Sequence, residues 1–379
     1  MAIDCDQHLF EYRGLWADHI DPALRGEAIR FVDDPRGHTW VMWRDRKLAL
    51  ADVSFPGETD AIGRRFARAR ADLAPEGLYD ELLPRDYWDP EARATKLAEI
   101  GVDQAVVFPN YGLVWERTLG CSLPALTANM SAWNRWCAVV VKQGGGKLHP
   151  VAHLTLRDLD WLEGELRHLE TSGVRLAMIA PALVDGRQLS HPDLDRAWSA
   201  FAHHGVSPVF HVADQQRPFD DAWYTDGGEL GVPVVSSVFL WTAAALAVTD
   251  LIVNGVLDRH PDLRLGIVEL SAIWVPLYLR MLDGGWGFVR RLNGRSPAEL
   301  ELQPSEYFRR QVRVASFAYE LPARLSRDSG DLFMCCSDYP HSEGTAHPLD
   351  DYRAPGKHGV DPASAPGLFG HNLAFLLRS

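Results

Sequence analysis

Residues 333–341 read Phe-Met-Cys-Cys-Ser-Asp-Tyr-Pro-His, an apolar run that stops at Ser337 and Asp338 and turns at Pro340. A short apolar run bounded by turn residues is typical of a buried strand, so Asp338 and His341 are expected at its carboxyl end. Enzymes built on a closed parallel barrel carry their reactive groups at that end of the strands. The stretch therefore predicts an α/β barrel with a functional site at its mouth.

The start of the chain repeats this pattern. Residues 3–8 read Ile-Asp-Cys-Asp-Gln-His. Side chains alternate along a strand, which predicts Asp4, Asp6 and His8 on one face and Cys5 and Gln7 on the other. The first strand therefore offers an Asp-x-His pair to one side of the sheet.

A third apolar run, residues 206–211, ends on the imidazole of His211. In a closed barrel the carboxyl ends of all strands face one mouth, so Asp6, His8, His211 and Asp338 can meet although they are far apart in sequence. Zinc and manganese accept mixed imidazole and carboxylate ligands, and such sites can leave a position open for water. Taken singly, these side chains are equally well explained as buried hydrogen-bonded pairs or a turn cap. Together, at three strand ends, they predict one divalent metal, with Zn²⁺ expected first and Mn²⁺ second.

Eight apolar runs, most of them separated by helical segments, define the fold class. The predicted strands are residues 2–6, 104–108, 148–153, 175–179, 206–211, 264–269, 313–317 and 332–337. The predicted helices are residues 90–100, 123–142, 156–171, 192–204, 238–259, 272–283, 320–327 and 368–377. Strands that alternate with helices pair in parallel through right-handed crossovers, and eight of them close a (β/α)8 TIM barrel.

Two insertions exceed the usual length of a strand–helix connection. Residues 9–89 follow the first strand and residues 212–237 follow the fifth, both on the side of the predicted mouth. We expect a single domain over residues 1–379, with the insertion at about 9–89 as a cover over the pocket.

Composition limits the possible partners. Of 379 residues, 46% are hydrophobic and 10% aromatic, and 38 basic against 51 acidic side chains give a net charge of −13. That charge disfavours nucleic acids and anionic membranes and leaves a small-molecule substrate. The five cysteines form no CxxC pair, which predicts reduced thiols and a cytoplasmic location. We expect no signal peptide and no membrane span, because the first strand begins at once and no apolar run is long enough.

The motifs in combination resemble the amidohydrolase-related family, the "amidohydrolase 2" branch of the metal-dependent hydrolase superfamily that includes aminocarboxymuconate semialdehyde decarboxylase. They are residues 3–8, 208–211, 254–264 leading to Glu269, 274–276 and 337–344, and the likeness runs from residue 3 to residue 372. The resemblance implies a distorted (β/α)8 barrel with one divalent metal on Asp6, His8, His211 and Asp338. It also implies a homodimer or larger homo-oligomer, for which the segment 274–286 could be interface or core.

Two positions depart from the family pattern. Asp6 stands where many superfamily members have His, which makes the site more anionic and more tolerant of Mn²⁺. Gly266 stands where the decarboxylases resembling this chain carry a catalytic His, three residues before Glu269. His153, at the end of the third strand, and His341 could replace it, but His153 could equally be a satisfied core residue and His341 a support for a metal ligand.

Glu269 ends the apolar run 265–269, where a carboxylate would be buried and its pKa raised. It therefore suits a catalytic acid or base, or a support for the metal site. Tyr339 and Trp274 fit the wall of a substrate pocket, as does His153.

These residues predict a metal-dependent hydrolase in which a metal-bound water attacks a small carbonyl or carboxylate compound, aromatic in view of the tryptophan-rich rim. Asp338 would accept the proton, and Glu269 or His341 would assist the leaving group. The alternative is a nonoxidative decarboxylase of an aromatic or unsaturated acid, against which Gly266 counts. A barrel that only binds is the remote alternative, because none of the four ligands is missing.

Overall fold

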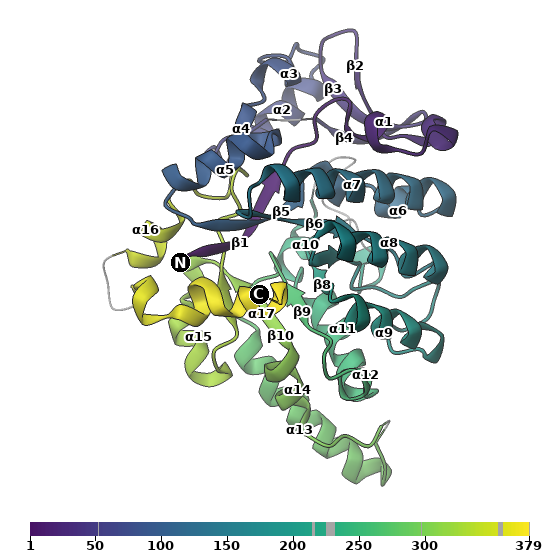
Figure 1. Ribbon diagram of the computed structural model, residues 1–379, viewed down its shortest axis with the longest axis vertical. Coiled ribbons are helices and arrows are strands. Elements are labelled where there is room, and N and C mark those ends of the chain that lie inside the picture. Colours follow the sequence, from purple (N-terminus) through teal and green to yellow (C-terminus); the bar gives the residue numbers. More distant parts are fainter. Residues whose placement is uncertain (52, 214–216, 225–231, 297, 355–358, 379) are drawn as a thin grey trace.

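A computed structural model describes residues 1–378 except 52, 214–216, 225–231, 297 and 355–358. Eight parallel strands form one sheet in the order β1, β5, β6, β7, β8, β9, β10, β11 (Figure 1). Their bounds are β1 Ile3–Leu9, β5 Gln104–Pro109, β6 Leu148–His153, β7 Leu176–Met178, β8 Ser207–Phe210, β9 Leu265–Ile267, β10 Val312–Ser316 and β11 Phe333–Cys335. All eight predicted strands are confirmed, and with them the (β/α)8 barrel.

The barrel closes where β11 meets β1, and this seam is irregular. The Asp338 N–H donates to the Asp6 carbonyl at 2.9 Å, and the His8 N–H donates to the Tyr339 carbonyl at 2.8 Å. The Asp4 carboxylate joins the same two segments, because it accepts hydrogen bonds from the backbone N–H and the hydroxyl of Ser337. The first and last strands thus meet through turn residues that also carry the site.

The predicted alternation along β1 is wrong, because the strand contains a bulge. Asp4 pairs with Ala105 but Gln7 pairs with Val107, so β1 holds one residue more than β5 between these pairs. Asp4 and Gln7 consequently share the outer face, where the Gln7 amide donates to Asp4 at 2.9 Å. Cys5 joins the core inside the barrel. A bulge bends a strand and redirects its side chains, and here Asp6 and His8 keep a common side while Asp4 leaves it.

The barrel helices surround the sheet (Figure 1). They are α5 Pro90–Glu99, α6 Glu116–Leu119, α7 Leu123–Gln143, α8 Leu159–Ser172, α9 Asp195–His204, α10 Val234–Val238, α11 Thr242–Val253, α12 Val256–Arg259, α13 Val275–Asn293, α14 Pro304–Gln311, α15 Pro322–Ser329, α16 Pro348–Arg353 and α17 Asn372–Leu377. The predicted helix 238–259 is divided, because Gly255 adopts a φ of 74° before α12. The helix predicted at 272–283 extends to Asn293, and α14 was not predicted.

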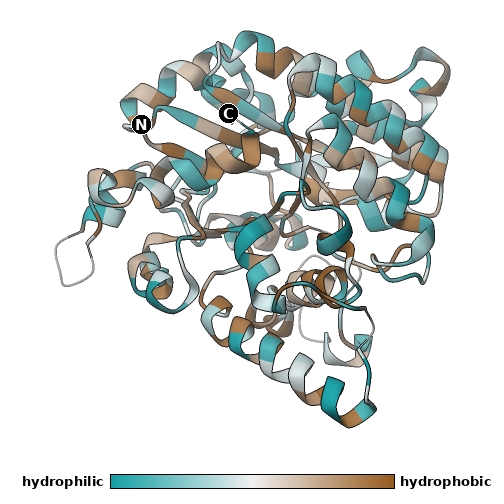
Figure 2. Cartoon of the chain, turned by 60° about the horizontal axis from the view of Figure 1, so that its bottom comes forward, coloured by the Kyte–Doolittle hydropathy of each residue, from teal (hydrophilic) through white to brown (hydrophobic). Residues whose placement is uncertain are grey.

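The interior of the barrel is a packed core, not a channel. Inward side chains such as Val106, Val151 and Met334 form one buried cluster, and Leu373 and Leu376 of α17 join it from below. Figure 2 shows apolar segments concentrated around the strands. The buried polar side chains of Asp6, His8, His211 and Asp338 lie above this core, at the mouth of the barrel. All five cysteines are free, and within the described residues no helix is long and apolar enough to cross a bilayer.

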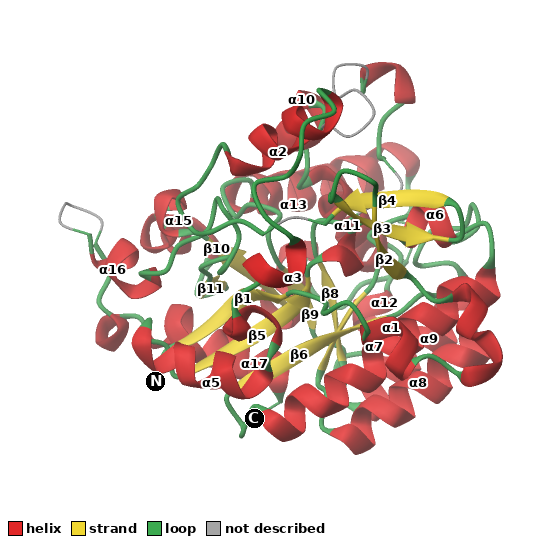
Figure 3. Cartoon of the chain, turned by 90° about the horizontal axis from the view of Figure 1, so that it is seen from above, coloured by secondary structure: helices red, strands yellow, loops and turns green. Residues whose placement is uncertain are grey.

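Residues 9–89 fold into an additional layer that was predicted only as a long insertion. An antiparallel sheet of β2 Arg30–Asp33, β3 Thr39–Trp43 and β4 Arg46–Leu50 is joined by α1 Leu15–His19, α2 Ala61–Arg70, α3 Tyr79–Leu82 and α4 Arg85–Trp88 (Figures 1 and 3). The Gly57 N–H donates to the Ser342 carbonyl at 2.9 Å, so the layer reaches the turn after β11. Of the second insertion, residues 214–216 and 225–231 lie outside the described residues.

Candidate metal centre

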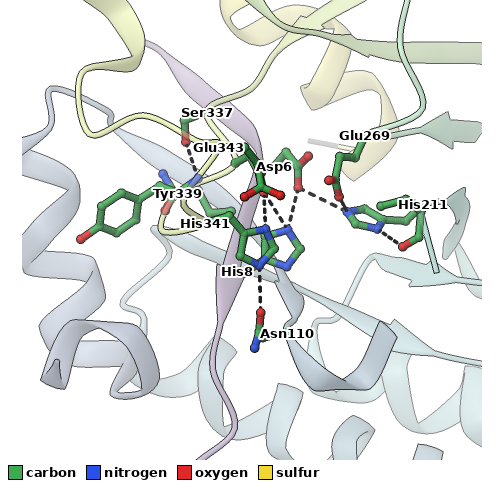
Figure 4. Close-up of polar contacts among 12 residues, drawn as sticks. Asp6, His8, Asn110, His211, Glu269, Ser337, Tyr339, His341 and Glu343 are labelled. Carbon is green, nitrogen blue, oxygen red and sulfur yellow. Dashed lines mark hydrogen bonds and ion pairs between the residues drawn. The ribbon is translucent and has the colours of Figure 1, made fainter. Parts of the chain in front are cut away.

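Five side chains from four strand ends converge at the mouth of the barrel. Figure 4 labels four of them, Asp6, His8, His211 and Glu269. Asp6 and His8 belong to β1, His211 follows β8, Glu269 follows β9 and Asp338 follows β11. The first three and Asp338 are at most 2% exposed, and the Glu269 side chain is 19% exposed. Two imidazoles and three carboxylates therefore share one largely buried space.

The distances between their terminal atoms match those between ligands of one ion. His8 Nε2 lies 3.5 Å from Asp6 Oδ1 and 3.2 Å from Asp338 Oδ1, and His211 Nε2 lies 3.5 Å from Asp6 Oδ1 and 3.2 Å from Glu269 Oε2. With ligands about 2.1 Å from a metal, neighbouring ligand atoms stand roughly 3.0 to 3.4 Å apart in octahedral or tetrahedral geometry. The side chains are spaced as a coordination sphere requires.

Both imidazoles are turned so that Nε2 faces the cluster. His8 Nδ1 lies 2.9 Å from the Pro109 carbonyl and His211 Nδ1 lies 2.7 Å from the Val212 carbonyl. A carbonyl only accepts, so Nδ1 carries the hydrogen in each ring and Nε2 of the neutral ring offers a lone pair. A backbone partner that fixes the tautomer in this way is usual for a metal-binding histidine.

The inward-facing atoms lack hydrogen bonds. Within the part of the chain that the structure describes, both Asp6 oxygens, His8 Nε2, His211 Nε2 and Glu269 Oε2 have no hydrogen-bond partner. Buried polar atoms without partners are costly and rare, because their desolvation is not compensated. A divalent cation among them would satisfy all of these atoms, so the residues present fit such a group.

Burial and neighbouring charges shift the pKa values of the cluster residues in different directions. Burial raises the pKa of Glu269 well above its usual value, and the negative charges of Asp338 and Asp6 raise it further. Burial would lower the pKa of His8, but Asp338 and Asp6 outweigh it and raise that pKa well above normal. Burial would likewise raise the pKa of Asp338, but His341 and His8 hold it below its usual value. The cluster attracts positive charge, as a metal site does.

Glu269 lies at ligand distance, and it adds a candidate to the predicted ligand set. Terminal atoms of Asp6, His8, His211 and Glu269 all lie within 4.8 Å of one another. Asp338 groups instead with His8 and His341, and with Glu269, His341 and Glu343. The sequence assigned Glu269 to catalysis and Asp338 to the metal. Glu269 stands beside three of the predicted ligands, and Asp338 Oδ1 lies 3.2 Å from His8 Nε2, so both carboxylates remain candidates.

His341 supports Asp338. Its Nδ1 lies 2.8 Å from Asp338 Oδ1, its Nε2 lies 2.8 Å from Asn110 Oδ1, and its ring stacks on His8 with centroids 3.9 Å apart. Asn110 is a site residue that was not predicted. It directly follows β5, so the rule that polar residues after strands meet at the mouth could have found it.

Two positions at the site have strained backbones. Glu269 and Asp338 adopt φ of 53° and 57°, in the left-handed region that non-glycine residues seldom occupy. Such conformations cost roughly 1 to 3 kcal/mol and concentrate at functional sites. Gly344 permits the turn around Asp338, because a Cβ at this position would lie 2.3 Å from the Asp338 carbonyl oxygen.

The three residues predicted to contact substrate are not brought into the cluster. The Tyr339 hydroxyl donates to Asp86 at 2.8 Å, and the ring points away from the metal ligands (Figure 4). The Trp274 indole donates to the Leu270 and Ser271 carbonyls and is buried.

His153 Nε2 lies 3.1 Å from Glu116 Oε2, and its Nδ1 is buried with no hydrogen-bond partner among the described residues. His153 thus has one structural partner, and its second nitrogen is the only polar atom of the ring left for a ligand.

Gly266 faces the lower core instead of the mouth. A Cβ at this position would lie 3.2 Å from Leu376 of α17 and 3.2 Å from Val209. An imidazole there would be packed among apolar side chains below the cluster. The missing His at this position therefore carries less weight against decarboxylation than the sequence suggested.

A cavity of about 520 Å³ lies beyond Glu343, and none of the five cluster side chains is among its described lining residues. Its lining includes Phe317, Tyr319, Tyr352 and Glu343. The Glu343 carboxylate lies within 4.8 Å of terminal atoms of Glu269 and Asp338. Phe317 and Tyr319 stack with ring centroids 5.5 Å apart. The volume suits a small organic molecule beside an aromatic wall.

The sequence matches no known family profile and no curated protein. Similar solved structures exist. An amidohydrolase from Mycobacterium avium subsp. paratuberculosis K-10 is 21% identical, with a TM-score of 0.78 over 99% of this chain and 98% of that one. The 5-carboxyvanillate decarboxylase LigW from Sphingomonas paucimobilis is 16% identical, with a TM-score of 0.65 over 100% and 98%.

The 5-carboxyvanillate decarboxylase from Novosphingobium aromaticivorans DSM 12444, complexed with manganese and 4-hydroxy-3-methoxy-5-nitrobenzoic acid, is 15% identical, with a TM-score of 0.66 over 100% and 96%. At these identities the likeness shows the shared fold. It agrees with the resemblance seen in the motifs, and both amidohydrolases and decarboxylases occur among these neighbours.

Proposed function

We propose that this protein is a metal-dependent hydrolase of small organic molecules. The observation that carries the proposal is the set of ligand atoms without hydrogen bonds from Asp6, His8, His211 and Glu269, spaced 3.2 to 3.5 Å apart along the contacts of the two imidazoles. Zn²⁺ and Mn²⁺ both suit two imidazoles with carboxylates, and manganese is bound in the Novosphingobium decarboxylase. A bound divalent ion would supply a Lewis acid that lowers the pKa of water and polarises a substrate oxygen.

The lowered pKa of Asp338 supports its role as the base of the proposed reaction. Asp338 is ionised at neutral pH because His341 and His8 hold its pKa low, so its free oxygen can accept a proton from attacking water. Glu269 has a raised pKa because of burial and its acidic neighbours when no cation is bound, and a bound cation would favour its ionised, ligating form. His341 orients Asp338 through Nδ1 and is itself oriented by Asn110.

The cavity supports an uncharged aromatic substrate. Phe317 and Tyr319 present stacked rings, while Glu343 and Asp351 contribute acidic groups to the lining. A substrate carboxylate would be repelled by these acids wherever it is not neutralised. Aryl esters, lactones and amides therefore fit better than aromatic acids.

Nonoxidative decarboxylation is the second candidate. It is favoured by the decarboxylases among the structural neighbours, and Gly266 counts less against it because this position faces away from the mouth. His341, whose Nδ1 lies 2.8 Å from Asp338 Oδ1, would then be the candidate to handle the proton for the product carbon.

One screen distinguishes these candidates. The protein is loaded with Zn²⁺ or Mn²⁺ and offered aryl esters, lactones, amides and hydroxylated aromatic acids, with ¹⁸O incorporation from water and CO₂ release measured in parallel. Label in the product acid supports hydrolysis. Release of CO₂ with no labelled acid product supports decarboxylation instead. Retention of both activities in Asp338→Asn would contradict the proposed base. We also propose a cytoplasmic location, because the five cysteines are free.

A further inference from the structure

Helix α13 carries an apolar stripe that faces solvent. Leu277, Met281, Phe288 and Leu292 are between 57% and 69% exposed. At 3.6 residues per turn they fall within an arc of about 60° on one side of the helix. The opposite side packs on the barrel through Val275, Leu279 and Leu282. The helix thus has two apolar faces, and the protein itself covers only one of them.

The second half of α13 stands away from the body of the protein (Figure 2). The whole helix, Val275–Asn293, is described, and it has no buried residue after Leu282. Polar anchors hold the first half, where Arg280 pairs with Asp328 at 3.2 Å and Asp283 accepts from the Ser305 N–H at 2.8 Å. Both anchors lie off the stripe, which is left to another partner.

The stripe is symmetric about its centre. Leu277 and Leu292 lie at equal sequence distance from the midpoint between Gly284 and Gly285, and so do Met281 and Phe288. Two copies of the helix packed antiparallel around that midpoint would place Leu277 against Leu292 of the other copy and Met281 against its Phe288. A two-fold interface needs a surface that complements itself in this way.

The two central glycines fit a close helix crossing. A Cβ at Gly284 or Gly285 would meet nothing within 4 Å, so the chain's own packing does not require glycine there. Glycine in an exposed helix is unfavourable, and adjacent glycines need another reason. Without Cβ atoms at the crossing, two helices can approach closely enough for the larger flanking side chains to interlock.

We propose that α13 packs antiparallel against α13 of a second copy of this chain, with a two-fold axis at Gly284 and Gly285. The stripe together with Ile273 and Val289 exposes on the order of 700 Å², more than the largest apolar patch of a typical monomer and close to the roughly 800 Å² that each partner buries in a stable interface. No charged side chain of α13 lies within the stripe, so two copies of a chain with net charge −13 can meet there without a buried charge.

The test uses pairs of substitutions in the full-length protein. Leu277→Glu with Leu292→Glu places like charges across both predicted contacts, whereas Leu277→Glu with Leu292→Lys places opposite charges there. Both residues are more than half exposed, so the fold of each chain should persist, as circular dichroism would show. Leu73→Glu, at another exposed apolar side chain, is the control.

Light scattering after size exclusion should give twice the 42.3 kDa chain mass for the unaltered protein, the control and the opposite-charge pair. The like-charge pair should give half that value, the mass of one chain. A monomeric unaltered protein would overturn the proposal, and so would a dimer that survives the like-charge pair. Equal loss of the dimer in both pairs would overturn the antiparallel register. None of these readings depends on enzymatic activity, so the outcome is separate from that of the proposed hydrolase.

Discussion

Replacement of Glu269 by Gln should stabilise the metal-free protein at neutral pH. Terminal atoms of Glu269 and Asp6 lie within 4.8 Å of each other. Two unit charges at that separation repel by about 3 kcal/mol at an effective dielectric constant near 20. Because Glu269 can bind a proton and avoid part of this repulsion, we expect the Gln variant to gain about 1 to 2 kcal/mol in free energy of unfolding.

The gain should depend on pH with a definite sign. Glu269 has an ordinary pKa of 4.5 in the unfolded chain and a pKa well above this in the folded one. Below pH 4.5 both states are protonated, and the substitution removes no repulsion. As pH rises above that value the unfolded chain loses its proton first, so the folded protein loses stability until its own raised pKa is passed. The advantage of Gln should therefore be absent in acid and grow toward neutral pH.

Metal should reverse the effect. A cation compensates the carboxylates, and loss of one charge from the cluster should weaken metal binding by at least about 10- to 100-fold. Urea unfolding of both proteins, with chelator and with saturating Zn²⁺ or Mn²⁺, measures each case. The contradicting result would be a difference in free energy of unfolding between the Gln variant and the unaltered protein that is the same at neutral pH as in acid, with chelator present. Glu269 would then not share an anionic cluster with Asp6.

Three further substitutions test neighbouring contacts. Asp338→Asn should lower kcat on the substrate found in the screen by about 10²- to 10⁴-fold, because it removes the proposed base, and metal content measured alongside separates this from ligand loss. Tyr339→Phe should leave both metal content and kcat unchanged and cost about 1 kcal/mol in urea unfolding, because its hydroxyl bonds to the cover insertion; a large fall in kcat would place it at the substrate. Ser337→Ala should cost about 1 to 3 kcal/mol in the same assay, because it removes a donor from the buried Asp4; no loss would mean that the seam does not depend on this contact.

The barrel could be predicted because its strands are buried on both faces. Runs such as 105–108, Ala-Val-Val-Phe, are apolar and buried throughout, and strands of this kind that alternate with helices are typical of parallel α/β folds. The same topology placed Asp6, His8 and His211 at one mouth, since strand ends converge whatever their separation in sequence.

Other features depend on local geometry that composition does not encode. The bulge in β1 moved Asp4 to the outer face, because one extra residue reverses the alternation. The left-handed backbone at Glu269 turns its carboxylate into the cluster, where simple alternation left its direction open. The sheet β2–β4 lies within a long insertion in which short polar strands resemble loop sequence. The direction of Tyr339 is set by Asp86, a partner more than 250 positions away.

The most direct test of the metal centre is elemental analysis of the purified, unchelated protein alongside His211→Ala and His153→Ala. His153 is a matched control, because it is also a buried imidazole at a strand end but bonds to Glu116 outside the cluster. About one Zn or Mn per chain should be present in the unaltered protein and in His153→Ala and be absent from His211→Ala. No metal in the unaltered protein after reconstitution, or full metal content in His211→Ala, would contradict the assignment.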